Sequence, residues 1–398
     1  MDADRPLAGI RVLDFGLLTA GANTSAMLAD LGADVVKVES ATYLDPFRVV
    51  GKPDDAPGWW NRSPQFRFTN RNKRGVALNL KDPDGRRLVR ELARQCDVVV
   101  ENFRRGVLDR FGLGYADLRA INPRIVMAAI SSQGDTGPER MNVSFGSTLD
   151  ATSGIAALTG YDDEEPRISG MDVNYPDQVV SLFATGIIIA AVMQARRTGE
   201  GAFLDFSQRE VASFLIGEEI LAATAGGTPH DARRTGNAEA GLVLQDCWRS
   251  SDGRWIAVTV ADSTMATSCA AVLGLPTEAP ASALRDGLSR WTAARTADEA
   301  IGALLTAGVA AAPSQDGTHL IADRRLAGVT LAWTADGGLA KGLPYALDGR
   351  GLSIERSGPD LGQHTAEILR DLLGLPATEI AHLHETGVTS TMPQVGDV

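Results

Sequence analysis

The chain has 398 residues, and 44% of them are hydrophobic, enough for a large core divided among two or more domains. Its formal charge of −12 argues against nucleic acid or an anionic membrane as the main partner. Three cysteines, Cys96, Cys247 and Cys269, show no CxxC spacing and no nearby histidine. We therefore expect a reducing compartment, with neither a disulfide framework nor a metal site. Residues 1–5 carry no targeting pattern, so a cytoplasmic location is expected.

The first part of the chain alternates strand and helix patterns. Strands are predicted at 10–15, 34–39, 76–80, 97–101, 124–130 and 202–206. Helices are predicted at 23–31, 85–95, 115–121, 147–158, 177–197 and 209–223. This order is typical of an α/β fold in which helices cover both faces of a parallel sheet.

A Gly- and Pro-containing break at 226–234 separates this region from a different pattern. Two strands, at 243–248 and 255–260, are joined by a turn, and alanine-rich helices follow at 265–273, 289–296 and 298–307. We expect a large domain at 1–225, a small α+β domain at 226–325, and a C-terminal segment at 326–398 that returns to the large domain. Helices are predicted in that segment near 365–373 and 378–385.

Asp177 stands in the first turn of the most apolar predicted helix, directly after Pro176. Proline suits this turn, and the unpaired N–H groups and the helix dipole favour an anion there. Two interpretations stay open: a carboxylate that stabilises the dipole, or a functional one. A membrane span is not expected, because Ser181, Thr185 and Gly186 interrupt the apolar run.

Ligands of doubly wound folds bind at the carboxyl ends of the strands. Here these ends lead into the loops 16–21, 78–81 and 101–105. The first loop has neither a GxGxxG nor a P-loop pattern, which disfavours a dinucleotide. Basic residues near these loops suit the phosphates of an adenine nucleotide, and Phe103 suits its base; the alternative is a solvated basic face. The basic residues are Arg71, Lys73, Arg74, Lys81, Arg104, Arg105 and Arg110.

All five histidines lie outside residues 1–225, so no nucleophile–His–Asp triad is apparent. A carboxylate is therefore the leading candidate for covalent chemistry.

Several stretches together closely resemble the family III CoA-transferases, the CaiB/BaiF family. They are residues 10–39, 70–81, 101–112 and 196–201, and residues 359–365 match the family's C-terminal signature. The resemblance implies a Rossmann-like large domain formed by both ends of the chain, a smaller α+β domain and an interlocked homodimer. It also implies acyl-CoA and a small carboxylic acid as substrates, with no permanently bound cofactor and no metal.

The family's nucleophilic Asp lies about 21 positions before the Thr of an R-x-T-G-x-G motif, here Thr198, and so corresponds to Asp177. Asp172 is a nearby rival. The family's CoA contacts carry over to Leu18, Thr19, Ala20, Leu78, Asn79, Lys81, Asn102, Phe103 and Arg110. The chain departs from the family at Ser40, often Arg, at Thr19, commonly Gln, and at residues 236–241, which replace a glycine-rich loop.

The resemblance predicts an acyl-CoA:carboxylate CoA-transferase that works through an aspartyl anhydride and an aspartyl-CoA thioester. Two alternatives remain. An α-methylacyl-CoA racemase needs a His in the region corresponding to residues 143–148, which contain none. A non-catalytic CoA-binding protein would keep the fold without the chemistry.

Overall fold

The computed structural model describes residues 5–50, 52, 56–162, 164–170, 173–225, 234–326, 329, 331–335 and 337–394. The chain divides into two compact units. Unit 1 comprises Met1–Ile155, Ile168–Ala222 and Ala327–Val398, and unit 2 comprises Ala156–Arg167 and Ala223–Leu326.

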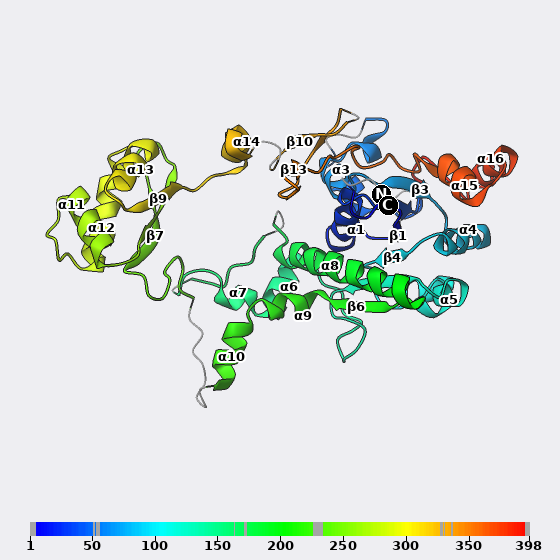
Figure 1. Ribbon diagram of the computed structural model, residues 1–398, viewed down its shortest axis with the longest axis horizontal. Coiled ribbons are helices and arrows are strands. Elements are labelled where there is room, and N and C mark those ends of the chain that lie inside the picture. Colours follow the sequence, from blue (N-terminus) through cyan, green and yellow to red (C-terminus); the bar gives the residue numbers. More distant parts are fainter. Residues whose placement is uncertain are drawn as a thin grey trace. The chain divides into compact units, whose positions relative to one another are not determined.

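Unit 1 is built on a six-stranded sheet with the order β3-β2-β1-β4-β5-β6 (Figure 1). Its strands are β1 (Arg11–Asp14), β2 (Asp34–Glu39), β3 (Arg74–Ala77), β4 (Val98–Glu101), β5 (Val126–Ser131) and β6 (Phe203–Ser207). Every neighbouring pair is parallel, which confirms the predicted sheet. The strand order reverses between β1 and β4, the position where doubly wound folds bind their ligands.

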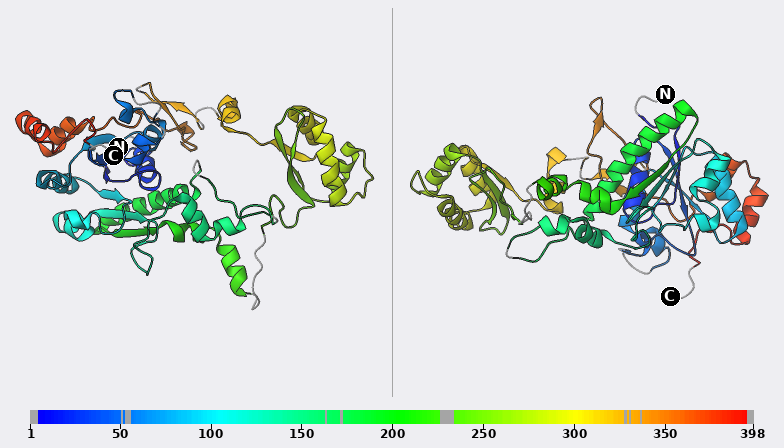
Figure 2. Two further views of the ribbon diagram at one scale, coloured as in Figure 1. Left: turned by 180° about the vertical axis from the view of Figure 1, so that it is seen from behind. Right: turned by 90° about the horizontal axis from the view of Figure 1, so that it is seen from below.

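Alternate residues along the strands build two cores, one on each face of the sheet (Figure 2). Leu13, Val36 and Val99 point toward one set of helices, and their neighbours Val12, Val35 and Val98 point toward the other. The first set includes α4 (Pro83–Arg94), α5 (Tyr115–Ile121), α15 (Thr365–Leu373) and α16 (Ala377–Glu385). The second includes α1 (Ala20–Asp30) and α8 (Tyr175–Thr198). Helix α15, near the C-terminus, contacts β3 and α4, so residues from both ends of the chain build this unit.

Helix α8 is long and apolar enough to cross a membrane by length and composition alone. One stripe of it, with Val180, Ala184 and Ile188, is buried in the core with α1 and the sheet, as in the core helix of a globular protein. The opposite stripe leaves Leu182 and Ile187 exposed.

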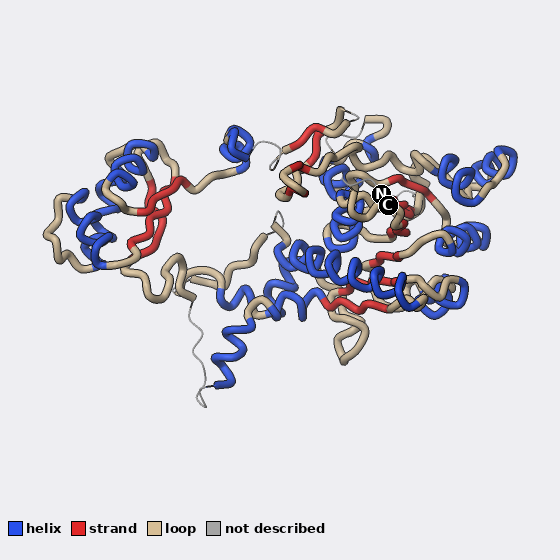
Figure 3. Tube along the Cα trace, in the orientation of Figure 1, coloured by secondary structure: helices blue, strands red, loops and turns tan. Residues whose placement is uncertain are grey.

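Unit 2 is an α+β unit with a three-stranded antiparallel sheet (Figure 3). Its strands are β7 (Leu244–Arg249), β8 (Trp255–Val260) and β9 (Ala310–Pro313), and its helices include α11 (Ser263–Leu273), α12 (Ala281–Ala293) and α13 (Ala297–Thr306). Trp248, Ile256 and Leu284 lie in the shared core. The predicted hairpin of β7 and β8 is confirmed, whereas β9 was not predicted because alanine and proline are poor strand formers.

Two helices predicted as continuous are interrupted. Residues 147–158 form α6 (Gly146–Ser153) and α7 (Ile155–Leu158), separated by Gly154 with a φ of +97°. Residues 209–223 form α9 (Gln208–Phe214) and α10 (Gly217–Ala225). The remaining elements are α2 (Pro46–Val49), η1 (Trp59–Asn61), α3 (Pro64–Thr69), η2 (Asp109–Phe111), α14 (Gly317–Ala322), η3 (Arg324–Leu326), β10 (Ala332–Trp333), β11 (Leu339–Ala340), β12 (Ala346–Leu347) and β13 (Arg350–Gly351).

Candidate active site

Asn102 joins the loop after β4 to the loop after β1. Its Oδ1 accepts a hydrogen bond from the Leu17 N–H at 2.7 Å, and its Nδ2 donates to the Leu17 carbonyl at 3.0 Å. Gly21 lies against this amide, where a Cβ would approach Oδ1 to 2.7 Å, and a Cβ on Gly16 would approach the Gly21 carbonyl carbon to 2.4 Å. The loop therefore needs both glycines for close packing, although it lacks a dinucleotide motif.

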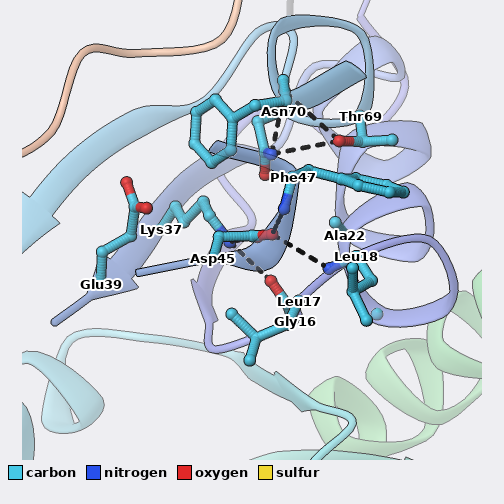
Figure 4. Close-up of polar contacts among 12 residues, drawn as sticks. Gly16, Leu17, Leu18, Ala22, Lys37, Glu39, Asp45, Phe47, Thr69 and Asn70 are labelled. Carbon is cyan, nitrogen blue, oxygen red and sulfur yellow. Dashed lines mark hydrogen bonds and ion pairs between the residues drawn. The ribbon is translucent and has the colours of Figure 1, made fainter. Parts of the chain in front are cut away.

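A buried ion pair between Lys37 and Asp45 also supports this loop (Figure 4). The Lys37 Nζ donates to the Gly16 carbonyl at 2.6 Å and lies 3.3 Å from the Asp45 Oδ2. The Asp45 Oδ1 accepts from the N–H groups of Phe47 at 3.0 Å and Leu18 at 3.4 Å. Leu18 is held in the left-handed region with a φ of +54°, an unusual conformation for this residue type.

Other predicted CoA contacts take different positions around these strand ends. Thr19 is the N-cap of α1 and Ala20 its first residue, and both are buried. The Leu78 side chain is buried in the core, so Leu78 offers only its backbone to a ligand. Asn79 donates from its backbone to the Val388 carbonyl at 2.9 Å and accepts from the Lys81 N–H at 3.1 Å.

The structure corrects the interpretation of four basic residues as free phosphate ligands. Each is held by a carboxylate of the fold: Arg71 pairs with Asp30, Lys73 with Asp14, Arg74 with Asp34, and Arg105 with Glu101. The side chains of Lys81, Arg104 and Arg110 are exposed and form no ion pair with any described residue. Phe103 is half-buried beside Phe15, with 6.5 Å between the ring centroids.

Asp177 lies where the first turns of three helices meet. It belongs to the first turn of α8, its Oδ1 accepts from the Nε2 of Gln208, the first residue of α9, at 2.8 Å, and its Oδ2 faces Gly146, the first residue of α6. A Cβ at Gly146 would lie 3.2 Å from this Oδ2. Positive partial charge at helix N-termini favours the ionised carboxylate. Asp172, the rival candidate, lies outside the described residues.

Asp177 and Gln208 are joined by a long segment made of helix α8 and strand β6. The chain leaves Asp177 along α8, ends that helix at Gly199, and comes back along β6 to Gln208. At the far turn, Gly201 donates from its N–H to the Pro123 carbonyl at 2.8 Å, and a Cβ on it would lie 1.9 Å from the Ile125 carbonyl oxygen. Glycine is therefore required there.

The pKa of Asp177 is raised to about 6. Burial is the main cause and the negative charge of Asp150 adds to it, whereas the hydrogen bond from Gln208 lowers the pKa. Asp150 is fully buried, and its Oδ2 accepts from the Ser169 N–H at 2.8 Å and the Ser169 hydroxyl at 2.7 Å. Its Oδ1 is buried without a hydrogen-bond partner in the described part of the chain.

Sequence reasoning missed both Gln208 and Asp150. Gln208 did carry a signal, because it lies two residues after the predicted strand at 202–206, where ligand-binding residues of this fold gather. Asp150 carried none, since its proximity to Asp177 arises from helix packing.

In unit 2, the loop at 236–241 is fixed by local contacts. Asn237 donates from its Nδ2 to the Tyr161 hydroxyl at 2.7 Å and to the Asp246 Oδ1 at 2.9 Å. Gly236 packs on the Tyr161 ring, which a Cβ would approach to 2.4 Å. Across the described residues of both units, no group of three His, Cys, Asp or Glu side chains is placed to hold a metal ion.

Comparisons with known proteins agree with this architecture. The family model described as CoA-transferase family III matches residues 7–365. The chain is 32% identical to succinyl-CoA–D-citramalate CoA-transferase of Chloroflexus aurantiacus, covering 95% of this chain and 97% of the relative. It is 31% identical to succinate–glutarate CoA-transferase of Agrobacterium fabrum, covering 92% and 96%.

Among solved structures, a CaiB/BaiF family protein from Brucella suis superposes with a TM-score of 0.84 at 28% identity, covering 93% of this chain and all of that one. The predicted resemblance is confirmed, and the chain belongs to the family III CoA-transferases.

Proposed function

We propose that this enzyme moves CoA between an acyl-CoA thioester and a small carboxylic acid, with Asp177 as its nucleophile. One observation carries the proposal: Gln208 donates a hydrogen bond to one oxygen of the Asp177 carboxylate, while the other oxygen, beside Gly146 and Asn174, accepts no side-chain hydrogen bond from any described residue. A fixed carboxylate with one oxygen that is not engaged in a hydrogen bond is suited to nucleophilic attack.

In this mechanism Asp177 attacks the thioester carbonyl and forms an aspartyl–acyl anhydride and a CoA thiolate. The thiolate then attacks the aspartyl carbon, which gives an aspartyl-CoA thioester and releases the donor acid. The acceptor acid then attacks the aspartyl-CoA thioester, which gives a new anhydride and a CoA thiolate. The thiolate attacks the acceptor's acyl carbon, which gives the product acyl-CoA and frees Asp177. A pKa of about 6 leaves Asp177 ionised at neutral pH and makes it more basic, hence more nucleophilic, than a fully solvated aspartate.

We place CoA across the carboxyl ends of β1, β3 and β4. The exposed side chains of Lys81, Arg104 and Arg110 supply charge for its phosphates, and Phe103 offers a ring for its base. Asn102, Lys37 and Asp45 hold the loop after β1, and Asn102 joins it to the loop after β4. The loop at 78–81 is held by the Asn79 N–H, which donates to the Val388 carbonyl.

For substrates, we propose succinyl-CoA as donor and a dicarboxylic acid as acceptor. The names of two relatives pair succinyl-CoA with D-citramalate and succinate with glutarate. Mass-spectrometric measurement of CoA exchange, over a panel of acyl-CoAs and mono- and dicarboxylic acids, tests this choice.

We also propose an interlocked homodimer located in the cytoplasm. Apolar side chains on neighbouring helices support a partner surface: Leu182, Phe183 and Ile187 of α8 and Phe214 of α9 are exposed, and the Phe183 and Phe214 rings lie 5.7 Å apart. Contiguous apolar patches of this kind are rare on monomeric proteins.

The nucleophile is tested by trapping. Incubation with succinyl-CoA followed by hydroxylamine or borohydride should modify one carboxylate, on the peptide that contains Asp177. A label on another carboxylate, Asp172 in particular, would contradict the assignment. Asp177→Asn should lower turnover by several orders of magnitude, because the covalent intermediate cannot form.

A further inference from the structure

Gln208 is held rigidly beside the nucleophile. It is buried and begins α9 directly after β6. On one side, the Ser207 hydroxyl caps the helix by accepting from the Glu210 N–H at 3.2 Å. On the other, the Arg209 N–H donates to the Ser132 carbonyl at 3.1 Å. The backbone therefore fixes where the Gln208 amide points, and that amide donates to the Asp177 Oδ1 at 2.8 Å.

The two oxygens of Asp177 are thereby distinguished. Oδ1 is occupied by the Gln208 N–H, whereas Oδ2 faces Gly146, where a Cβ would come within 3.2 Å. Within the described residues, the Gln208 amide is the one side-chain hydrogen-bond donor to this carboxylate. Oδ2 is consequently the oxygen that can reach an acyl carbon, and Oδ1 stays with the protein amide.

We propose that Gln208 is a catalytic residue whose amide N–H stabilises the oxyanion formed on the Asp177 Oδ1 when the CoA thiolate attacks the aspartyl carbon. This inference rests on the proposed role of Asp177 as nucleophile and assigns a specific later step of the reaction to Gln208.

In the first step, the Asp177 Oδ2 forms a bond to the thioester carbonyl carbon. The C–S bond breaks, and CoA leaves as a thiolate with the electron pair. Oδ1 becomes the carbonyl oxygen of the aspartyl half of the anhydride and loses most of its negative charge. The hydrogen bond from Gln208 therefore does not help this step.

In the second step, the thiolate sulfur bonds to the Asp177 Cγ, and the carbonyl π pair moves onto Oδ1. The Gln208 N–H already points at this atom, so it stabilises the charge where the charge develops. Collapse of this intermediate breaks the Cγ–Oδ2 bond, and the donor acid departs as a carboxylate that carries Oδ2. Attack of the acceptor carboxylate on the aspartyl-CoA thioester places charge on the same Oδ1, so Gln208 serves that step as well.

The test is Gln208→Met, which keeps the length of the side chain and removes the N–H donor. The enzyme is mixed with succinyl-CoA that is isotopically labelled in the succinyl group, without an acceptor, then quenched and digested for peptide mass spectrometry. Wild-type enzyme should carry CoA on Asp177 and release labelled succinate. The variant should carry the succinyl group on Asp177 and release free CoA, because resolution of the anhydride is slowed.

In steady state, Gln208→Met should lower kcat by about 10²–10³-fold, the usual effect of removing an oxyanion donor, with little change in the KM for succinyl-CoA. The acid limb of its pH–rate profile should also move to higher pH, since the hydrogen bond from Gln208 lowers the pKa of Asp177. Gln178→Met is the matched control. Gln178 follows Asp177 in the first turn of α8, but its Oε1 accepts a hydrogen bond from the Asn23 Nδ2 at 2.9 Å. The Gln178→Met control should carry CoA on Asp177 and release labelled succinate, as the wild type does.

Gln208→Glu provides a second variant in case the Met variant does not fold. A carboxyl group donates only when protonated, so its activity should fall as pH rises, with a basic limb that wild type lacks. Wild-type turnover in Gln208→Met would overturn the proposal. So would a slow Met variant that still carries CoA on Asp177, or a Glu variant without the basic limb. Absence of any adduct on Asp177 in wild type would instead refute the proposed nucleophile.

Discussion

Lys37 and Asp45 form an ion pair in which both side chains are completely buried and the Nζ lies 3.3 Å from the Oδ2. This Oδ2 has no other polar partner in the described part of the chain, so Lys37 is the group that balances its charge. Burial opposes the charge of Lys37, but the carboxylates of Asp45, Asp14 and Glu39 outweigh it and raise the pKa of the lysine. Lys37 therefore stays charged while it holds the Gly16 carbonyl.

Asp45→Asn should destabilise the protein by roughly 3 kcal/mol, because it leaves the buried lysine without its nearest counter-charge. The loop at 16–20 should also loosen, so CoA affinity should fall. Urea unfolding and calorimetric titration measure the two effects. As a control, Asp298→Asn disrupts an exposed pair with Arg254 and should cost less than about 1 kcal/mol. Equal stability of the two variants would contradict the structural role of the buried pair.

Asp150→Asn should shift the acid limb of kcat/KM to lower pH. The charge of Asp150 raises the pKa of Asp177, so its removal lets the nucleophile ionise in more acidic solution. The new amide oxygen can still accept from Ser169. Comparison of pH–rate profiles checks this, with Asp286→Asn, an exposed position in unit 2, as the control. An unchanged or upward-shifted limb would show that Asp150 does not act on Asp177 through its charge.

Asp177→Asn should make the folded protein more stable at neutral pH even though it abolishes transfer. The folded state binds a proton at Asp177 with a pKa of about 6, whereas in the unfolded chain the aspartate has its ordinary pKa of 3.8. The folded state therefore holds more protons between these values, and stability falls as pH rises through this window. Removing the carboxyl removes that loss, which is worth about 1–3 kcal/mol above pH 6. Thermal or urea unfolding at pH 4 and pH 8 should show a gain that is present only at the higher pH.

Lys81→Ala and Arg110→Ala should each weaken CoA binding by roughly 1–3 kcal/mol, because each removes a charged partner of a phosphate. The dependence of affinity on salt should become shallower in both variants. Arg119→Ala, which removes an exposed charge from α5, should bind CoA as wild type does. Calorimetric titration with CoA at two salt concentrations distinguishes the two site variants from the control. If Lys81→Ala or Arg110→Ala bound CoA with the affinity of the wild type, that residue would not contact a CoA phosphate.

Phe183→Glu and Phe214→Glu should weaken the proposed dimer, since each introduces a charge into the exposed apolar patch. Sedimentation over a wide concentration range measures the association. Glu218→Gln, an exposed charge change on the nearby α10, should leave the association unchanged. An active wild-type monomer that persists at all concentrations would rule out a homodimer.

The sequence predicted the sheet and most helices of unit 1 because their signals are local. Helices α5 and α15 were predicted with the observed bounds, and glycines, Gly114 and Gly374, cap their ends. The charge pairing could not be predicted, because it depends on which distant residues the fold brings together. Lys73 and Asp14 are 59 residues apart, and Gln208 and Asp177 are 31 residues apart. Asp177 was predicted as the nucleophile from its place in a helix and its spacing to a motif, and this role stays a prediction.

The close packing of Gly201 has a mechanical consequence for the chemistry. Helix α8, with Asp177 in its first turn, and strand β6, which leads to Gln208, are joined at their far ends by the turn that Gly201 anchors to the Pro123 carbonyl. A single added methyl group there would collide with the Ile125 carbonyl and push the strand along its own axis. The misalignment would appear at the other end of the strand, between a donor and an acceptor that the mutation never touches. A substitution at Gly201, before the start of β6, should therefore alter the hydrogen bond between Gln208 and Asp177 although it touches neither residue.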